Sequence, residues 1–384
     1  MHPWQLEAES SRMRLVGHND MGGRGDCMHV NVVGVHAFVG HMGQTRLGTS
    51  ILDVSDPSQP RVVAQIQAPD GIHTHKVQVV DDVMLVNHER YGSSTTGQGG
   101  LAAYDVSRPD DPRQIGFLPM PGKGVHRMTW WGGQYAWTTG SDEGYVDQFL
   151  IVVDVSDPSR LVEAGRWWYP GTHQAAGETF ARPPDRTHRL HHALVDGDRA
   201  YLGHRDVGLV ILDISDPTSP TFVSELGFGL ESRRSHTALR LPGRDVVVVT
   251  DEATTDGCTD PHRRVRIVDI ADEKQPQLLA TLPIPEGNFC DRGGRFGPHN
   301  LHEHRPGSLQ SSNRIYLTYF NAGVRVYDVT NASSPRELGY YIPPAPAGRS
   351  SIQMNDLTVT SDGLIWATDR HAGGLYVLEL DESS

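Results

Sequence analysis

The sequence predicts an all-β protein, a seven-bladed β-propeller with four antiparallel strands per blade and an N-terminal strand that closes the ring. Three observations support this prediction. A short motif returns at intervals of about fifty residues, and such a period is typical of propellers, solenoids and arrays. Two strand-like runs joined by a tight polar turn precede each copy. The last copy has no strand after it, whereas an unassigned strand-like run lies near the N-terminus.

The motif is a β-branched run that ends in an acidic residue, with Ser, Asp and Pro often following. Its fullest form is Ile51-Leu52-Asp53-Val54-Ser55-Asp56-Pro57. The β-branched part suits a pleated strand, and the Asx side chain and the proline then end the strand and set a turn. The acidic residues that mark the seven copies are Asp53, Asp105, Asp154, Asp213, Asp269, Asp328 and Glu379.

Each repeat supplies the other strands of a blade. Residues 77–80 and 83–86 flank a two-residue polar turn and form a hairpin before the second motif. Residues 61–66 provide the strand that follows the first motif, so one repeat contains four antiparallel strands. For the seventh blade we expect residues 11–16 to provide the fourth strand. Residues 1–384 then make a single propeller domain.

The repeated Leu/Val-x-Ile/Val-Asp pattern resembles the LVIVD repeat, and the resemblance extends over nearly the whole chain. It implies a propeller. It implies little about activity, because such repeats occur in proteins with many uses.

Composition excludes several classes of function. A net charge of -13 without a Lys/Arg block argues against a nucleic-acid surface, and no apolar run is long enough to span a membrane. No secretory signal is visible, and three cysteines lack zinc-like spacing, so we expect a reduced cytoplasmic protein. A Cys258–Cys290 pair remains an open alternative. The expected partner is a small molecule, and no pattern indicates an oligomeric state.

The 20 histidines are the unusual feature of the composition. Strand alternation places the start of each inner strand at one mouth of the central channel, and six of the seven blades have a histidine near that point. Neutral imidazoles that converge on a small volume are typical ligands of transition metals. We expect one divalent metal, with iron favoured over Mn, Zn, Cu or Ni. The predicted ligands are His75, His126, His236 and His302, with His192 and His299 as substitutes.

The competing interpretation is that these polar side chains fill a wet channel and bond to buried water. His304 alternates with His302 along a strand, so it is a further candidate ligand or else faces the next blade.

Charged residues accompany the histidines at the same mouth. Glu89, Glu252, Arg127 and His192 are the candidate catalytic residues, and the carboxylates could also orient metal-binding imidazoles. Arg90, Arg205, Arg234 and Arg370 are the candidate substrate-binding residues, because guanidinium groups gathered in an acidic protein suit an anionic ligand. Alternatively, the arginines only neutralise nearby carboxylates.

These features predict a metal-dependent enzyme that acts on a small anionic organic molecule. An all-histidine shell resembles the iron site of the carotenoid-cleavage oxygenases, which implies an oxygenase or oxidoreductase. The cluster is also similar in architecture to the manganese site of oligogalacturonate lyases, so a lyase or hydrolase is the first alternative. A non-catalytic interaction propeller is the second. Polarity that converges on the axis, rather than on an exposed rim, favours an enzyme.

Overall fold

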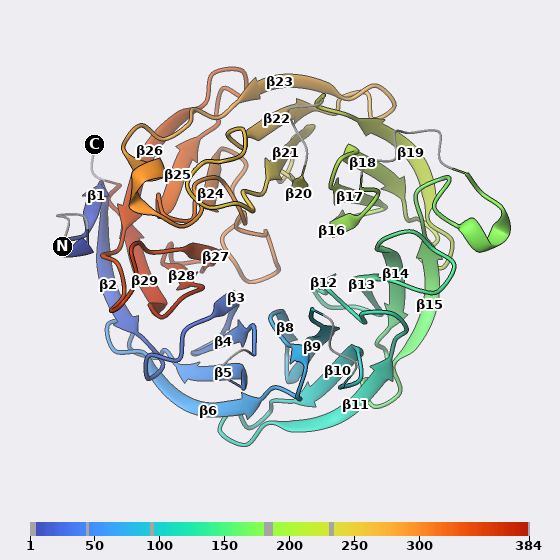
Figure 1. Cartoon of the computed structure of the whole chain (residues 1–384), viewed down its shortest axis with the longest axis horizontal. Coiled ribbons are helices and arrows are strands. Elements are labelled where there is room, and N and C mark those ends of the chain that lie inside the picture. Colours follow the sequence, from blue (N-terminus) through green and yellow to red (C-terminus); the bar gives the residue numbers. More distant parts are fainter. Residues whose placement is uncertain (1–4, 44–45, 93–95, 180–186, 230–233, 383–384) are drawn as a thin grey trace.

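The computed structural model describes residues 5–43, 46–92, 96–179, 187–229 and 234–382. Seven antiparallel sheets surround a central axis, with β3, β8, β12, β16, β20 and β27 nearest to it (Figure 1). The predicted all-β, seven-bladed propeller is confirmed.

Each blade contains four strand positions from the axis outward, and the innermost position of blade two is divided between two short strands. In blade six the innermost position is residues 299–302, which bond to β24, and β1 is added as an outer strand. Blade one has β3 (Cys27–Val33), β4 (His36–His41), β5 (Leu47–Asp53) and β6 (Arg61–Gln67); blade two has β7 (Ile72–His73) and β8 (Val77–Val80), β9 (Val83–Arg90), β10 (Gly100–Asp105) and β11 (Arg113–Pro119). Blade three has β12 (Arg127–Thr129), β13 (Tyr135–Gly140), β14 (Phe149–Asp154) and β15 (Val162–Trp167); blade four has β16 (Leu190–Asp196), β17 (Arg199–His204), β18 (Gly208–Asp213) and β19 (Thr221–Leu226). Blade five has β20 (Ser235–Arg240), β21 (Val246–Asp251), β22 (Val265–Asp269) and β23 (Gln277–Thr281); blade six has β24 (Arg314–Thr318), β25 (Val324–Asp328), β26 (Arg336–Ile342) and β1 (Glu9–Ser11). Blade seven has β27 (Met354–Val359), β28 (Ile365–Asp369), β29 (Gly374–Leu380) and β2 (Met13–Asn19), and two short 3-10 turns, η2 (Gln174–Ala176) and η3 (Phe289–Arg292), lie between blades.

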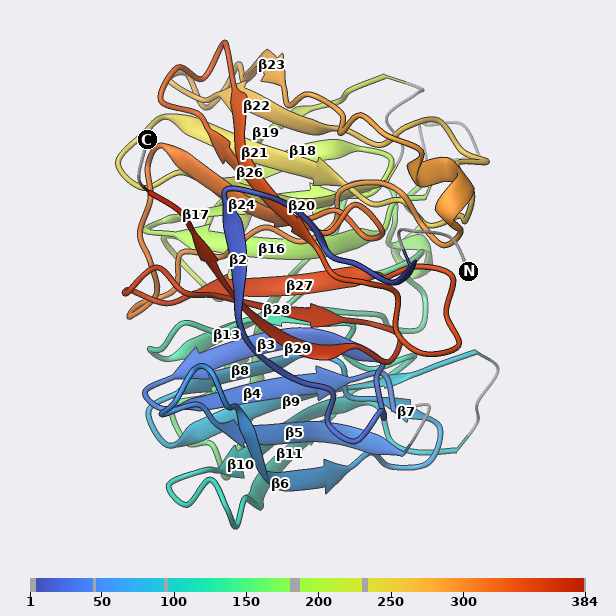
Figure 2. The same ribbon diagram turned by 90° about the vertical axis from the view of Figure 1, so that its left-hand side faces the viewer.

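The N-terminal segment closes the ring, as predicted. Strand β2 pairs antiparallel with β29, from Met13 opposite Leu380 to Asn19 opposite Leu375. Figure 2 shows this region from the side of the ring, where β2, β27, β28 and β29 face the viewer. Strand β1, which continues the same segment onto β26 of blade six, is an element that the sequence pattern does not predict.

The repeated acidic residue is a turn-forming group. Asp53 Oδ1 accepts a hydrogen bond of 2.9 Å from the Ser55 amide, and Asp56 Oδ1 accepts one of 2.9 Å from the Ser58 amide. The bonds from Ser55, with help from Arg61, lower the pKa of Asp53 to about 2. The motif therefore has a structural role in the turns, and it indicates the fold and not the function.

In every blade, the strand that pairs with the outer side of the motif strand has a small residue at one fixed position. That residue lies opposite the motif residue two positions before the acidic one. These residues are Gly17, Ala64, Gly116, Gly165, Ser224, Ala280 and Gly339. At Gly116 an added Cβ would lie 2.1 Å from the Pro158 carbonyl oxygen, in the Asp-Pro turn of the next blade. Neighbouring blades therefore approach too closely here for a larger side chain.

The hydrophobic core is divided among the interfaces between blades. Val39 of blade one and Val377 of blade seven, for example, belong to one buried cluster.

One cysteine pair differs from the expectation of a fully reduced protein. Cys258 and Cys290 form a disulfide that joins the loop after β21 to η3, whereas Cys27 is free and buried. Within the described ranges, no helix is long and apolar enough to cross a membrane. The cytoplasmic location stays a prediction.

Candidate functional site

A cavity of about 320 Å³ opens at one end of the central channel. Its walls include the first residues of the inner segments of several blades, which is where the sequence places the site. The side chains that matter for its chemistry are five histidines (His75, His126, His191, His236, His299), two carboxylates (Glu89, Glu252) and the arginines Arg90, Arg127, Arg189, Arg205, Arg295 and Arg370.

A recurrent irregularity of the inner strands points these side chains at the axis. In four blades the pairing register skips one residue, and the skipped residues are Met28, His191, His236 and Asn355. A bulge of this kind turns the extra side chain toward the same side as its neighbour, so the strand presents two consecutive residues to the channel. In blades two and three His75 and His126 lie just before the paired part of the strand.

The histidines form a continuous arc. Ring centroids are 5.2 Å apart for His75 and His126, 4.9 Å for His126 and His191, 3.9 Å for His191 and His236, and 4.4 Å for His236 and His299. Burial is the largest cause that lowers the pKa of each one well below its usual value, and neighbouring arginines add to it for most of them. The imidazoles are therefore neutral at pH 7, the form that binds metals.

Hydrogen bonds hold the Nδ1 side of three rings. Nδ1 of His126 lies 2.8 Å from Glu89 Oε2, and Nδ1 of His191 lies 3.1 Å from the His236 carbonyl oxygen. Nδ1 of His299 lies 2.6 Å from the Asn355 carbonyl oxygen. Carbonyl oxygens accept, so His191 and His299 donate through Nδ1 and present the lone pair of Nε2, and His126 does the same when Glu89 is ionised.

Two of these lone pairs face each other. Nε2 of His126 and Nε2 of His191 are 3.1 Å apart. Two acceptors at this distance need a cation between or beside them, either a proton or a metal ion. Two metal–nitrogen bonds of about 2.0–2.1 Å span such a separation when they meet close to a right angle. The donor set therefore fits a transition metal, and ligand atoms of His191, His236 and Glu252 also lie within 4.8 Å of one another.

His236 is partly engaged in this conformation. Its Nδ1 lies 2.8 Å from Thr237 Oγ1, and Arg127 Nη1 lies 3.3 Å from its Nε2. Arg127 is fully buried and also donates to Asn300 Oδ1 at 2.9 Å. His236 Nε2 can join a metal only if Arg127 Nη1 moves away from it.

The two carboxylates differ in charge. Burial raises the pKa of Glu89 to about 7. Burial acts in the same direction on Glu252, but Arg205, His299 and Arg295 outweigh it and hold its pKa well below the usual value. Glu252 is thus a fixed anion, with Arg205 at 2.8 Å and Arg295 at 3.3 Å.

Three of the four predicted substrate-binding arginines line the cavity. Arg90, Arg205 and Arg370 are there, whereas Arg234 pairs with Asp260 at 3.7 Å and does not line the cavity. Burial, followed by the nearby Arg295, lowers the pKa of Arg370 to about 10. Several guanidinium groups therefore lie close together in a buried cavity, which favours an anionic ligand.

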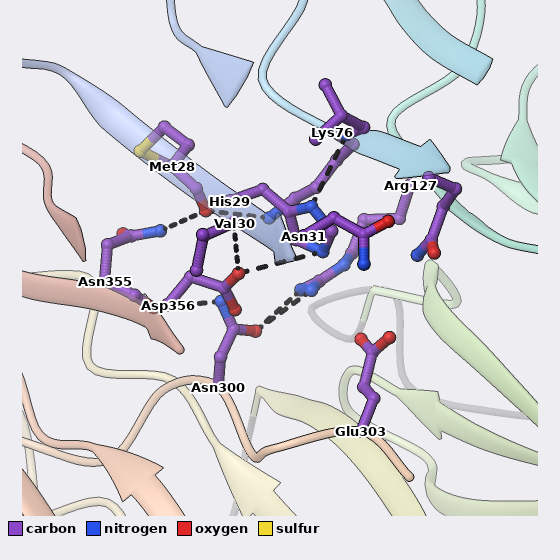
Figure 3. Close-up of polar contacts among 12 residues, drawn as sticks. Met28, His29, Val30, Asn31, Lys76, Arg127, Asn300, Glu303, Asn355 and Asp356 are labelled. Atoms are coloured by element: carbon purple, nitrogen blue, oxygen red, sulfur yellow. Dashed lines mark hydrogen bonds and ion pairs between the residues drawn. The ribbon is translucent and has the colours of Figure 1, made fainter. Parts of the chain in front are cut away.

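A second polar layer of the channel contains His29, Lys76, Arg127, Asn300 and Asp356 (Figure 3). His29 Nε2 lies 3.7 Å from Asp356 Oδ2, and the buried Lys76 donates from Nζ to the Met28 carbonyl oxygen at 3.2 Å. Burial is the main cause that lowers the pKa of Lys76 and raises that of Asp356.

His192 belongs to this second layer and not to the arc. Its Nε2 lies 3.0 Å from Thr129 Oγ1 and 3.7 Å from Glu303 Oε1. His191, which the sequence prediction passed over, lines the cavity in its place, because a regular alternation takes no account of the bulge. The role of His192 stays a prediction. A signal for His191 is present in the sequence, since Leu190-His191 aligns with Val125-His126 and Ser235-His236.

His302, predicted as a ligand, lies elsewhere. Its Nε2 donates to the Leu309 carbonyl oxygen at 2.8 Å, and its Nδ1 accepts from the Val359 amide at 3.1 Å. Both ring nitrogens are hydrogen-bonded to backbone groups, so neither is available to a metal. His304 lines a separate cavity beside Trp131.

Comparisons with known proteins support the fold. Residues 24–67, 144–168 and 193–226 match the LVIVD repeat model. A hypothetical selenium-binding protein from Sulfolobus tokodaii is 13% identical with a TM-score of 0.58, covering 92% of this chain and 85% of its own. A putative 6-phosphogluconolactonase from Bacteroides fragilis is 12% identical with a TM-score of 0.58, covering 89% and 93%.

Raptor from Chaetomium thermophilum is 11% identical with a TM-score of 0.60, covering 97% of this chain and 30% of its own. No curated protein matches at a significant level. At such low identity the solved structures show a shared fold and nothing of activity. The chain is thus a seven-bladed β-propeller in which three stretches match the LVIVD repeat.

Proposed function

We propose that this propeller is a metal-dependent enzyme, with one histidine-ligated divalent metal on its axis and a small anionic organic molecule as its substrate. An oxidoreductase that uses dioxygen is the favoured class. The single observation that carries the proposal is the pair of Nε2 atoms of His126 and His191, which face each other at 3.1 Å while both Nδ1 atoms are already bonded.

The surrounding residues have distinct roles in this proposal. His126 and His191 hold the ion, with His236 and His299 beside them in the arc. Glu89 orients His126 and, with a pKa of about 7, is suited to accept or deliver a proton at neutral pH. When bound, the metal supplies a Lewis acid and, if it is redox-active, an electron donor.

The arginines supply the affinity for an anion. Glu252 holds Arg205 and Arg295 in place, and Arg370 adds a third guanidinium to the same cavity. A volume of about 320 Å³ is at the small end of ligand sites, which suits a small organic acid. Arg127 and His192 lie below the arc, so we assign them positioning roles.

Elemental analysis of the purified, untagged protein tests the proposal, with two adjacent histidines as matched variants. His191→Ala removes an Nε2 that faces the cavity, whereas His192→Ala removes an equally buried ring one layer below. We expect H192A to hold as much metal as the wild type, and H191A to hold about one equivalent less. Full metal in H191A would show that the axial site is wrong.

The metal found also decides between classes. Iron or copper would support the oxidoreductase and justify substrate screening under air. Manganese, zinc or nickel would favour a lyase or hydrolase on the same site. No metal after reconstitution would contradict the proposal and favour an interaction propeller.

A further inference from the structure

A second group of potential ligands lies on the wall of the same cavity, in blade two. The short strand β7 ends at His73, and His75 lies two residues later in the connection to β8. Glu89 on β9 is the direct cross-strand partner of His73. The fold thus gathers two imidazoles from β7 and the connection after it, and one carboxylate from β9.

The three side chains are close, buried and incompletely satisfied. Their ligand atoms lie within 4.8 Å of one another, and His75 Nε2 is 3.9 Å from Glu89 Oε2. His73 is only 8% exposed, and its Nε2 has no hydrogen-bond partner in the described part of the chain. Tyr91 stacks on the His73 ring at 4.1 Å with planes 10° apart, which fixes the orientation of the ring. Asn87 Nδ2 is 3.4 Å from His75 Nδ1 and has a backbone carbonyl at 2.9 Å.

An unpartnered, buried imidazole nitrogen costs free energy unless a ligand takes it up. A water molecule could bond to one nitrogen, but it would not account for two histidines and a carboxylate converging on one point. Two histidines and one carboxylate with open positions toward a cavity are the donor set of many divalent first-row metal sites. His73, His75 and Glu89 all line the cavity, so ions can reach them.

We propose that His73, His75 and Glu89 bind a second divalent transition-metal ion beside the axial site. The inference rests on the proposed function in assigning His126 and His191 to the axial ion, which leaves His75 for the second. Glu89 links the two sites, because its Oε2 also lies 2.8 Å from Nδ1 of His126. The centre is then a pair of neighbouring ions joined through one carboxylate and its hydrogen-bonded imidazole.

Zinc alone is a suitable probe, because it accepts nitrogen and oxygen ligands and has no redox chemistry. The metal-free full-length protein is dialysed against Zn²⁺ and bound zinc is measured by elemental analysis, with circular dichroism as a check on folding. His73→Ala tests the second site and His191→Ala tests the axial site. His88→Ala is the matched control, because it removes a buried ring from the same strand as Glu89, one that packs near Phe117.

We expect two zinc ions in the wild type and the control, and one in each of the other variants. One ion in the wild type that H73A retains and H191A loses would overturn the second site and leave the axial site standing. One ion that H73A loses and H191A retains would support the second site and refute the axial one. Two ions that persist in H73A, or no zinc in any protein, would overturn the inference.

Discussion

Replacing Glu252 by glutamine should convert the cavity from a neutralised site into one that needs an external anion. The carboxylate lies between Arg205 and Arg295, and the side chains of Glu252 and Arg205 are 10% and 12% exposed. The amide keeps the shape of the side chain and removes its charge. Two guanidinium groups then face the cavity without their anion.

The size of the effect follows from burial. Removing one partner of a buried ion pair costs about 3–5 kcal/mol, because the other charge is left uncompensated. The Arg295 side chain is 25% exposed and is partly solvated. We therefore expect Glu252→Gln to lower the free energy of unfolding by about 3 kcal/mol, at the small end of that range. An anion at about 100 times its dissociation constant would restore about 2.7 kcal/mol.

Urea unfolding of the metal-free protein measures both effects. Each protein is unfolded in chloride and in acetate at equal ionic strength. Glu382→Gln is the control, because it breaks the exposed Arg314–Glu382 pair and should change stability by less than about 1 kcal/mol. Acetate should stabilise E252Q more than wild type. Equal stability of E252Q and wild type, or equal responses to acetate, would refute the idea that these arginines form an anion site.

Three further predictions concern the scaffold. Gly116→Ala should lower the free energy of unfolding in urea by about 1–3 kcal/mol through overpacking between blades. Gly227→Ala is the control and should lower it by less, because its Cβ would have its nearest contact at 3.3 Å. Equal losses of stability would contradict the close approach of the blades. Burial lowers the pKa of His302 to about 3 and of His304 to about 4. Below pH 6.5 these histidines are therefore protonated in the unfolded chain but stay neutral in the native state. Stability should fall from pH 7 to pH 5 by on the order of 2 kcal/mol per group, and the fall should be smaller in His304→Phe; an unchanged slope would rule this out. Deleting residues 1–19 should leave the edge of β29 unpaired and give a less stable, aggregating protein by light scattering, and a monomeric protein of wild-type stability would show that the closure is dispensable.

The fold could be predicted because its signal is repeated and local. Asp53 and its equivalents each end a strand and bind the amide two residues ahead, so the same short motif appears once per blade. The partner of the seventh motif was also predictable, since a blade that lacks a strand needs one from elsewhere. Strand β1 was not, because its three residues have no apolar alternation.

The site could be predicted only in part. His75, His126, His236 and His299 were placed at the correct mouth of the channel by counting along strands. A bulge adds one residue without any mark in the sequence, so counting selected the neighbour of His191. Counting residues along strands also does not show which groups a side chain is hydrogen-bonded to.

The position of the closing strand has a consequence for how the protein is made. Strand β2 leaves the ribosome long before its partner β29. About 360 residues separate them, which at about 5–20 residues per second takes roughly 20–70 s. During that time the nascent chain can complete the early blades in turn, but the two ends of the ring stay open. The ring can therefore close only after β29 has been made, and a chain that stalls before that point would expose two unpaired strand edges to chaperones and proteases.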